Sequence, residues 1–115
     1  MKHLEHVRSI SAEDRTFLSE ARSVIARVLP GAAVCVYGSA ARGARDPDSD
    51  LDLLILTAGS VSQKEEQRLI DALYDLELAR GVVLSLLWYT RDEWNAARTC
   101  ASPFRQRVEA EAVLV

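Results

Sequence analysis

Apolar residues recur at intervals of three and four positions in the first third of the chain, which is the spacing of one face of an α-helix. They are Phe17, Leu18, Ala21, Val24, Ile25, Val28 and Leu29. Ser11 and Asp14 precede this run as an N-cap and an acidic residue of the first turn. Pro30 and Gly31 follow it as a stop signal. The pattern predicts an amphipathic helix over residues 11–29 with its apolar face in the core.

A second helical pattern lies between Ser62 and Gly81. Ser62 and Glu65 form a capping box, and Gly81 is suited to end the helix. The apolar face comprises Leu69, Ile70, Leu73, Leu76 and Ala79. Capping sequences at residues 90–93 and 102–103 predict two shorter helices nearer the C-terminus.

Four other apolar runs lack helical spacing and have the length of β-strands: residues 32–37, 51–56, 82–89 and 112–115. The second run is apolar at nearly every position, which is typical of a strand buried on both faces. Because helices and strands alternate along the chain, we predict a single α/β (α+β) domain. Its sheet would be mixed with roughly four strands, and the helices would pack mainly on one face.

Two carboxylates interrupt the second apolar run at its start. Asp50 and Asp52 flank Leu51, and strand side chains alternate between faces, so the carboxylates point the same way. Their Cα atoms would be roughly 6–7 Å apart, which lets both side chains bind one cation or a pair of cations. Two like charges held together are costly without a counterion. Oxygen ligands favour magnesium, manganese or calcium over zinc.

The first predicted strand ends at Gly38 and Ser39. Gly38 permits backbone conformations closed to other residues and a close approach to the backbone. Ser39 offers a hydroxyl and an N–H, and it begins a predicted short helix whose free N–H groups would attract phosphate. Arg42 and Arg45 add positive charge nearby. A phosphate site beside a metal site is what phosphoryl or nucleotidyl transfer requires.

An alternative interpretation treats the acidic residues as turn chemistry. Residues 46–50, Asp-Pro-Asp-Ser-Asp, contain the proline and Asx residues typical of a turn, and Asp50 could end that loop. Asp52 does not fit this interpretation, because a carboxylate inside an apolar strand is costly unless something pairs with it. The metal-site interpretation is therefore favoured.

The combined motif resembles the signature of the DNA polymerase beta nucleotidyltransferase superfamily. In this chain the motif consists of Gly38-Ser39 and Asp50-Leu51-Asp52-Leu53, which are separated by ten residues. Arg42-Gly43 and Ser49-Asp50 resemble the smallest members, the minimal nucleotidyltransferases. The resemblance runs from about residue 34 to the C-terminus, and the spacing, apolar flanks and strand context agree.

This resemblance implies a polymerase-beta-like nucleotidyltransferase palm fold and a metal-dependent transfer of a nucleoside monophosphate, AMP from ATP, to an acceptor hydroxyl. Asp50 and Asp52 would be the catalytic pair and would bind Mg²⁺ or Mn²⁺. The nucleoside triphosphate would be held by Gly38, Ser39, Arg42 and Ser49. Many superfamily members carry a third carboxylate on the next strand, where it binds metal and activates the acceptor. The corresponding residue here is Ser85, and a serine cannot act as a base at neutral pH without help. A role in the site and a purely structural role in the strand are equally favoured for Ser85.

The resemblance leaves several biological roles open. Minimal nucleotidyltransferases are often encoded beside a helical HEPN-type protein, and some act as antitoxins that bind or adenylylate this partner. The chain could be the antitoxin enzyme of such a HEPN/MNT toxin–antitoxin pair. Alternatively, it could be a catalytically weak or inactive nucleotidyltransferase-fold binding module that neutralises the partner by complex formation. A small-molecule adenylyltransferase is a third interpretation, but those enzymes usually carry an extra helical domain, for which 115 residues leave little room unless a dimer supplies it.

Composition narrows the class of protein. The chain has 115 residues, of which 49% are hydrophobic, and this is enough for one compact domain. A net charge of −3 argues against a dedicated nucleic-acid surface, which would be basic. Cys35 and Cys100 are too few for a disulfide framework, and no zinc spacing exists. His3 and His6 have no further ligands beside them and are expected to be solvated.

The N-terminal residues lack a clear pattern. We predict a loose lead-in over residues 1–10 and a nucleotidyltransferase domain over residues 11–115. The lead-in lacks the apolar segment of a signal peptide, and no run reaches the length of a membrane span. These features predict a cytoplasmic protein without membrane contact. Homo-oligomer formation stays open.

Overall fold

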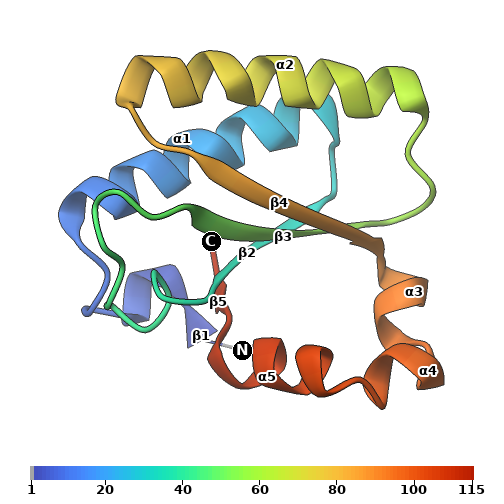
Figure 1. Cartoon of the computed structure of the whole chain (residues 1–115). Coiled ribbons are helices and arrows are strands. Elements are labelled where there is room, and N and C mark those ends of the chain that lie inside the picture. The colour runs from blue at the N-terminus through green and yellow to red at the C-terminus, as the bar shows by residue number, and fades with distance from the viewer. Residues whose placement is uncertain (1) are drawn as a thin grey trace.

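The computed structural model describes residues 2–115, which form a mixed sheet of five strands in the order β1-β5-β2-β3-β4 (Figure 1). The strands are β1 (Lys2–His3), β2 (Ala33–Tyr37), β3 (Leu51–Thr57), β4 (Leu84–Thr90) and β5 (Val113–Leu114). β2 to β5 correspond to the four predicted strands, although β4 begins at Leu84 rather than at residue 82. β1 is an additional short strand in the segment predicted as a lead-in.

The helices begin and end close to their predicted limits. Within residues 2–115 they are η1 (Leu4–His6), α1 (Ala12–Val28), α2 (Gln63–Arg80), α3 (Arg91–Asn95), α4 (Ala97–Cys100) and α5 (Pro103–Glu111). Ser11 caps α1 by accepting a hydrogen bond from the Asp14 N–H, as predicted. Both predicted capping boxes are present, at Ser62 and at Thr90. None of these helices is long and apolar enough to cross a membrane.

The strand pairing confirms the predicted mixed sheet. β2 and β3 pair antiparallel, whereas β3 and β4 pair parallel and are joined by the α2 crossover. β5 returns antiparallel beside β2, and β1 pairs parallel with β5. β2 and β3, which carry the predicted site, are therefore inner strands, and β4 is an edge strand.

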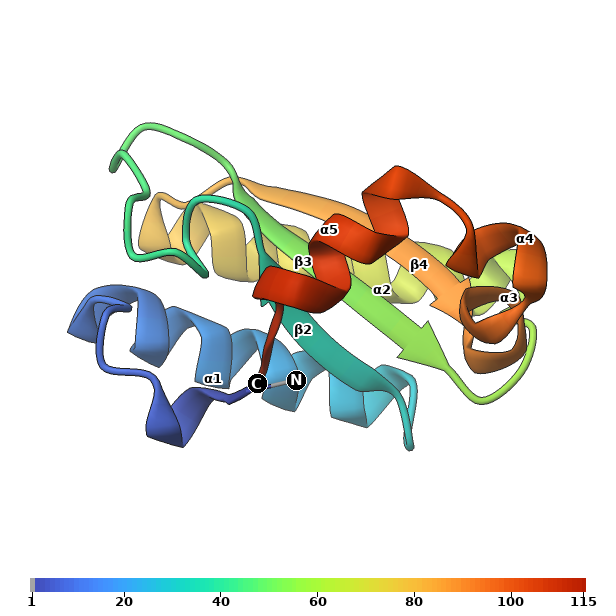
Figure 2. The ribbon, with the colours of Figure 1, turned by 90° about the horizontal axis from the view of Figure 1, so that it is seen from below.

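Helices cover both faces of the sheet. The two long helices, α1 and α2, lie on one face, and the short helices α3 to α5 lie below the other (Figures 1 and 2). Leu53 of β3 belongs to the core cluster under the long helices, and its neighbour Leu54 belongs to the cluster with Trp94 and Val108 of the short helices. Both leucines are fully buried, and each such burial contributes about 1.5–3 kcal/mol of stability. β3 is thus buried on both faces, as its apolar run predicts.

The first residues of the chain pack on this domain. β1 extends the sheet by pairing with β5, and Val7 and Ile10 are buried in the larger core cluster. Residues 2–10 are therefore joined to the sheet and to the core, while residue 1 lies outside the described part of the chain. The domain boundary at residue 11 stays a prediction.

Candidate active site

Asp52 lies in the middle of a row of polar side chains that crosses the sheet. It pairs with Tyr37 of β2 on one side and with Ser85 of β4 on the other. Directly paired residues project to the same face of a sheet, so the three side chains share one face. This is the face covered by the short helices, because Leu54 and Leu56 follow Asp52 by two and four positions and belong to that cluster. Asp52 is half-buried there.

Gly38, the first residue after β2, lies against Asp52. Its φ is +73°, in the region that favours glycine. A Cβ at Gly38 would lie 2.6 Å from the Oδ2 of Asp52. The space left by the missing side chain is thus used by the carboxylate. The predicted phosphate-binding and metal-binding ends of the motif are therefore in contact, with Asp50 exposed just before β3.

Residues 38–43 form a series of turns, so the predicted short helix after Ser39 is wrong. One helical turn does form, in which the Arg42 N–H donates to the Gly38 carbonyl at 3.3 Å. Gly43 then takes a φ of +71°, which reverses the chain before a helix can continue. Across residues 2–115, no hydrogen bond uses the Ser39 hydroxyl or the N–H groups of residues 39–41. Ser39, which is half-buried, therefore still offers its hydroxyl and N–H to an anion, whereas Ala40 and Ala41 are buried.

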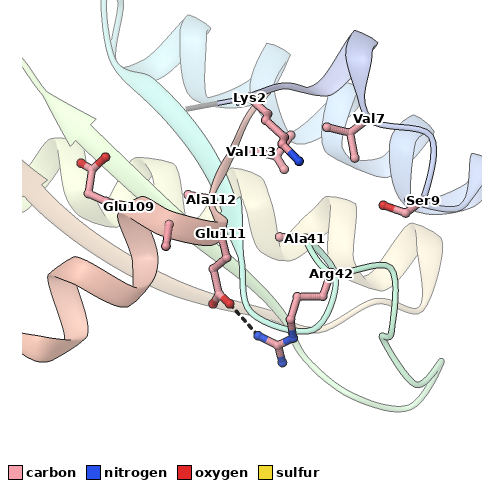
Figure 3. A pocket seen from close by; sticks show the side chains of 10 residues that line it. Lys2, Val7, Ser9, Ala41, Arg42, Glu109, Glu111, Ala112 and Val113 are labelled. Carbon is pink, nitrogen blue, oxygen red and sulfur yellow. Dashed lines mark hydrogen bonds and ion pairs between the residues drawn. The ribbon is translucent and has the colours of Figure 1, made fainter.

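Glu111, the last residue of α5, also contacts this turn, and Figure 3 shows its side chain directed at Arg42. Its Oε1 accepts a hydrogen bond from the Gly38 N–H at 3.1 Å. Its Oε2 accepts one from Nη1 of Arg42 at 2.8 Å. The Glu111 side chain is 20% exposed and that of Arg42 is 55% exposed. One carboxylate thus occupies two of the donors that the sequence assigns to a nucleotide.

Negative charge is concentrated around Asp52. Burial raises the pKa of its carboxyl group above the ordinary value, and the Asp50 charge raises it further. Arg42 lowers this pKa and Glu111 raises it. The pKa of Tyr37 is raised as well, first by burial and then by the Asp52 charge. An additional cation would be stabilised at this position.

Arg45 is held by a structural partner. Its Nη2 and Nε donate to the two carboxylate oxygens of Asp14 at 2.6 and 3.0 Å, and both side chains are only 11% exposed. Its Nη1 donates to the Ser49 carbonyl at 2.7 Å, which fixes the loop leading into Asp50. The Ser49 hydroxyl donates to the Asp46 carbonyl at 2.7 Å and stabilises the turn. The charge of Arg45, which the sequence places beside the phosphate site, is therefore balanced by Asp14.

A cavity of about 470 Å³ adjoins the turn (Figure 3). Arg42 and Glu111 line one side of it, and Lys2 and Ser9 line the other. Neither Asp50 nor Asp52 lines this cavity. The cavity is instead connected to them through the Arg42–Glu111 ion pair, which contacts Gly38 and through it Asp52.

Asp50 and Asp52 suit a divalent ion of the magnesium type. Both are oxygen donors, and the mutual repulsion that raises the pKa of Asp52 is the cost that a bound cation removes. Among residues 2–115, no group of three or more His, Cys, Asp or Glu side chains is placed to hold a metal. Mg²⁺ is usually held by one or two carboxylates together with substrate phosphates. The pair therefore fits an ion that is shared with a nucleotide.

Comparison with known families decides the class of protein. The family model described as a nucleotidyltransferase domain matches residues 18–113. The chain belongs to this nucleotidyltransferase family. The matched segment contains the turn after β2, Asp50, Asp52 and all of α2, so the family assignment covers the site described above.

Two solved structures are similar to this nucleotidyltransferase. One is described as a "putative minimal nucleotidyltransferase"; it is 28% identical with a TM-score of 0.63, and the match covers 96% of this chain and 98% of that chain. The other is a crystal structure of a toxin-antitoxin with AMP-PNP, at 15% identity and a TM-score of 0.57, covering 90% of this chain and 72% of that chain. The second likeness shows the fold alone. No curated protein matches the chain significantly. The predicted relation to minimal nucleotidyltransferases and the polymerase-beta-like fold are thereby confirmed.

Sequence reasoning missed three residues around the site. Glu111 lies 73 positions from Gly38, and an acidic residue near the end of a short helix is ordinarily solvated. The place of Asp14 in the first turn of α1 already explains an acidic residue there, so nothing in the sequence indicates its contact with Arg45. Tyr37 could have been found, because strand alternation and the pairing of β2 with β3 place it beside Asp52.

Proposed function

We propose that this nucleotidyltransferase moves AMP from ATP to an acceptor hydroxyl in a metal-dependent reaction. The contact between Gly38 and Asp52 is the observation that supports the proposal most. It joins a turn with unpaired N–H donors to a pair of carboxylates whose charges repel each other. A triphosphate and its cations would satisfy both halves of such a site at once.

Each proposed contact follows from a donor or acceptor at the site. Gly38, Ser39 and Arg42 would bind the triphosphate through N–H, hydroxyl and guanidinium donors. Asp50 and Asp52 would hold Mg²⁺ or Mn²⁺, which when bound neutralises phosphate charge and orients the phosphates. A contact between Ser49 and the nucleotide would require its hydroxyl to leave the backbone carbonyl that it now bonds.

In the proposed reaction, the acceptor oxygen forms a bond to the α-phosphorus of ATP while the bond from that phosphorus to the leaving oxygen breaks. Pyrophosphate leaves, and the proton of the acceptor hydroxyl passes to water. The residues of the chain contribute by fixing the phosphates and by balancing their charge. Ser85 is the neighbour of Asp52 on β4 and supplies neither a charge nor a base at neutral pH. We therefore expect slow transfer compared with an enzyme that carries a third carboxylate.

The second candidate function is neutralisation of a helical HEPN-type partner by complex formation, with weak or no catalysis. Ser85 in place of a carboxylate supports it, and so does the fold that the chain shares with a toxin-antitoxin structure. An antitoxin that adenylylates its partner would combine the two candidates. A cytoplasmic location stays a prediction from the sequence.

One labelling experiment tests both candidates. The purified protein is incubated with α-phosphate-labelled ATP, Mg²⁺ and a purified HEPN-type partner, and the partner is then separated from the mixture. Label on the partner supports nucleotidyl transfer, whereas a stable complex without label supports the binding module. Absence of ATP binding, of label and of a complex would refute both. The Asp52→Asn variant serves as the inactive control for transfer.

A further inference from the structure

Glu111 stands where an anionic ligand would be expected to bind. Its carboxylate accepts hydrogen bonds from the Gly38 N–H at 3.1 Å and from the Arg42 guanidinium at 2.8 Å. A carboxylate with two oxygens on an N–H and a guanidinium makes the charge-assisted contacts that a phosphate group makes. Both donors belong to the set that the proposed function assigns to the triphosphate.

We propose that Glu111 is an internal competitor of the nucleotide: its carboxylate occupies the phosphate donors of the turn until a phosphate displaces it. The inference rests on the proposed function, because it concerns the same donors. It assigns to Glu111 the regulation of nucleotide affinity, a role that the sequence does not indicate.

The charges at the site explain why Glu111 must move. The charges of Asp50 and Glu111 both act on the Asp52 carboxylate, and Arg42 is the cation that opposes them there. A triphosphate bound beside an unmoved Glu111 would meet a third carboxylate and would share the Arg42 guanidinium with it. Like charges at such short range are strongly unfavourable in a partly buried site. Displacement of Glu111 removes this repulsion and frees Arg42.

The cavity beside the turn provides a place for the displaced side chain. Glu111 lies at the C-terminal end of α5 and lines this cavity of about 470 Å³. Lys2 lies across the cavity from the Arg42–Glu111 pair, as Figure 3 shows. A rotation of the glutamate side chain into the cavity would bring it towards the Lys2 ammonium group, and side-chain rotations of this kind are fast. The backbone of α5 need not move.

A purely structural role for Glu111 predicts the opposite behaviour. If the glutamate only holds Gly38 and Arg42 in position for the nucleotide, its removal would disorder the turn and weaken binding. If it competes with phosphate, its removal would strengthen binding. The direction of the change in affinity therefore separates the two roles.

The test measures binding of ATP and of inorganic tripolyphosphate by isothermal titration calorimetry, with and without Mg²⁺, for the wild type, Glu111→Gln and Glu111→Ala. Glutamine keeps an acceptor for the Gly38 N–H but loses the charge, and alanine removes both contacts. We expect both variants to bind both ligands about threefold to tenfold more tightly than the wild type, since the loss of an ion pair and of a repulsion is of this order. The gain should be larger without Mg²⁺, where no cation offsets the negative charge.

Asp75→Asn is the matched control, because it removes one negative charge from an exposed position on α2. Its affinities should equal those of the wild type. Thermal melting of each variant shows that it is folded. Unchanged or weaker binding by Glu111→Ala, with measurable binding by the wild type, would overturn the competitor role and leave the proposed function intact. If no variant and no wild-type protein binds either ligand, the proposed function itself fails and the inference fails with it.

Discussion

A Cβ placed on Gly38 would lie 2.6 Å from the Oδ2 of Asp52, so the Asp52 carboxylate lies in space that only a glycine at position 38 leaves free. We expect Gly38→Ala to strain the backbone, whose φ is +73°, and to push the Asp52 carboxylate out of place. The free energy of unfolding should fall by about 1–2 kcal/mol from the backbone strain alone. Mg²⁺-dependent binding of ATP should be lost, as measured by calorimetry.

Gly31 supplies the matched control for this substitution. Its φ is +85°, but a Cβ there would meet no atom within 4 Å. Gly31→Ala should therefore lower stability by a similar amount and leave ATP binding unchanged. Equal loss of binding in both variants would show that Gly38 matters only for stability.

Asp52→Asn tests the carboxylate pair. We expect this variant to keep the fold and to lose Mg²⁺-dependent ATP binding, because one of two oxygen ligands with negative charge is gone. Asp48→Asn makes the same chemical change at an exposed position of the preceding loop and should bind ATP normally. Binding by Asp52→Asn that equals the wild type would refute the assignment of the metal site.

The same variant should be more stable than the wild type when no metal is present. Burial and then the charge of Asp50 raise the pKa of Asp52 in the folded protein above its ordinary value of 3.8. Ionisation of Asp52 therefore costs stability as the pH rises above 3.8, and the amide has no such cost. We expect a higher melting temperature for Asp52→Asn at neutral pH. The difference should vanish below pH 3.8, where Asp52 is protonated in both states.

The Asp14–Arg45 ion pair should be essential for stability. Arg45 links the first turn of α1 to the loop before Asp50, and both charged side chains are 11% exposed. Asp14→Asn leaves the guanidinium without its charged partner, so we expect a loss of about 3 kcal/mol in urea unfolding, the lower end of the cost of breaking a buried pair. Glu20→Gln is the comparison, because it breaks the more exposed pair with Arg80 and should have little effect.

The two cysteines should differ in reactivity. Burial raises the pKa of the Cys35 thiol to about 11, and only 1% of this residue is exposed. Cys100 is partly exposed. At about pH 8, where an ordinary thiol is partly ionised, we expect a disulfide reagent to modify Cys100 within minutes and Cys35 only after denaturation. Rapid modification of both thiols in the folded protein would contradict the packing of Cys35 in the smaller core cluster.

The sequence was most informative where a residue broke a local rule. Asp52 is a carboxylate in a strand that is otherwise apolar, and this conflict indicated a functional position; in the structure the carboxylate lies against Gly38. The capping boxes at Ser62 and Thr90 were equally local, so the starts of α2 and α3 followed from them.

Contacts between distant segments could not be read in this way. Glu111 and Asp14 look like ordinary charged residues of helix ends, and their partners lie 73 and 31 positions away. A short helix was predicted to begin at residues 39–42, whereas residues 38–43 form turns. Gly43 decided against it through a positive φ that the neighbouring residues do not reveal.

The position of β4 at the margin of the sheet has a consequence for the size of the acceptor. The row that starts at Tyr37 passes through Asp52 and ends at Ser85, and no further strand of residues 2–115 lies beyond it. In the proposed reaction, a bulky acceptor, even the surface of a folded protein, would therefore meet no further strand of the described residues on that side. Selectivity for the acceptor would then depend on how well the surface of the acceptor fits the edge of the sheet at β4.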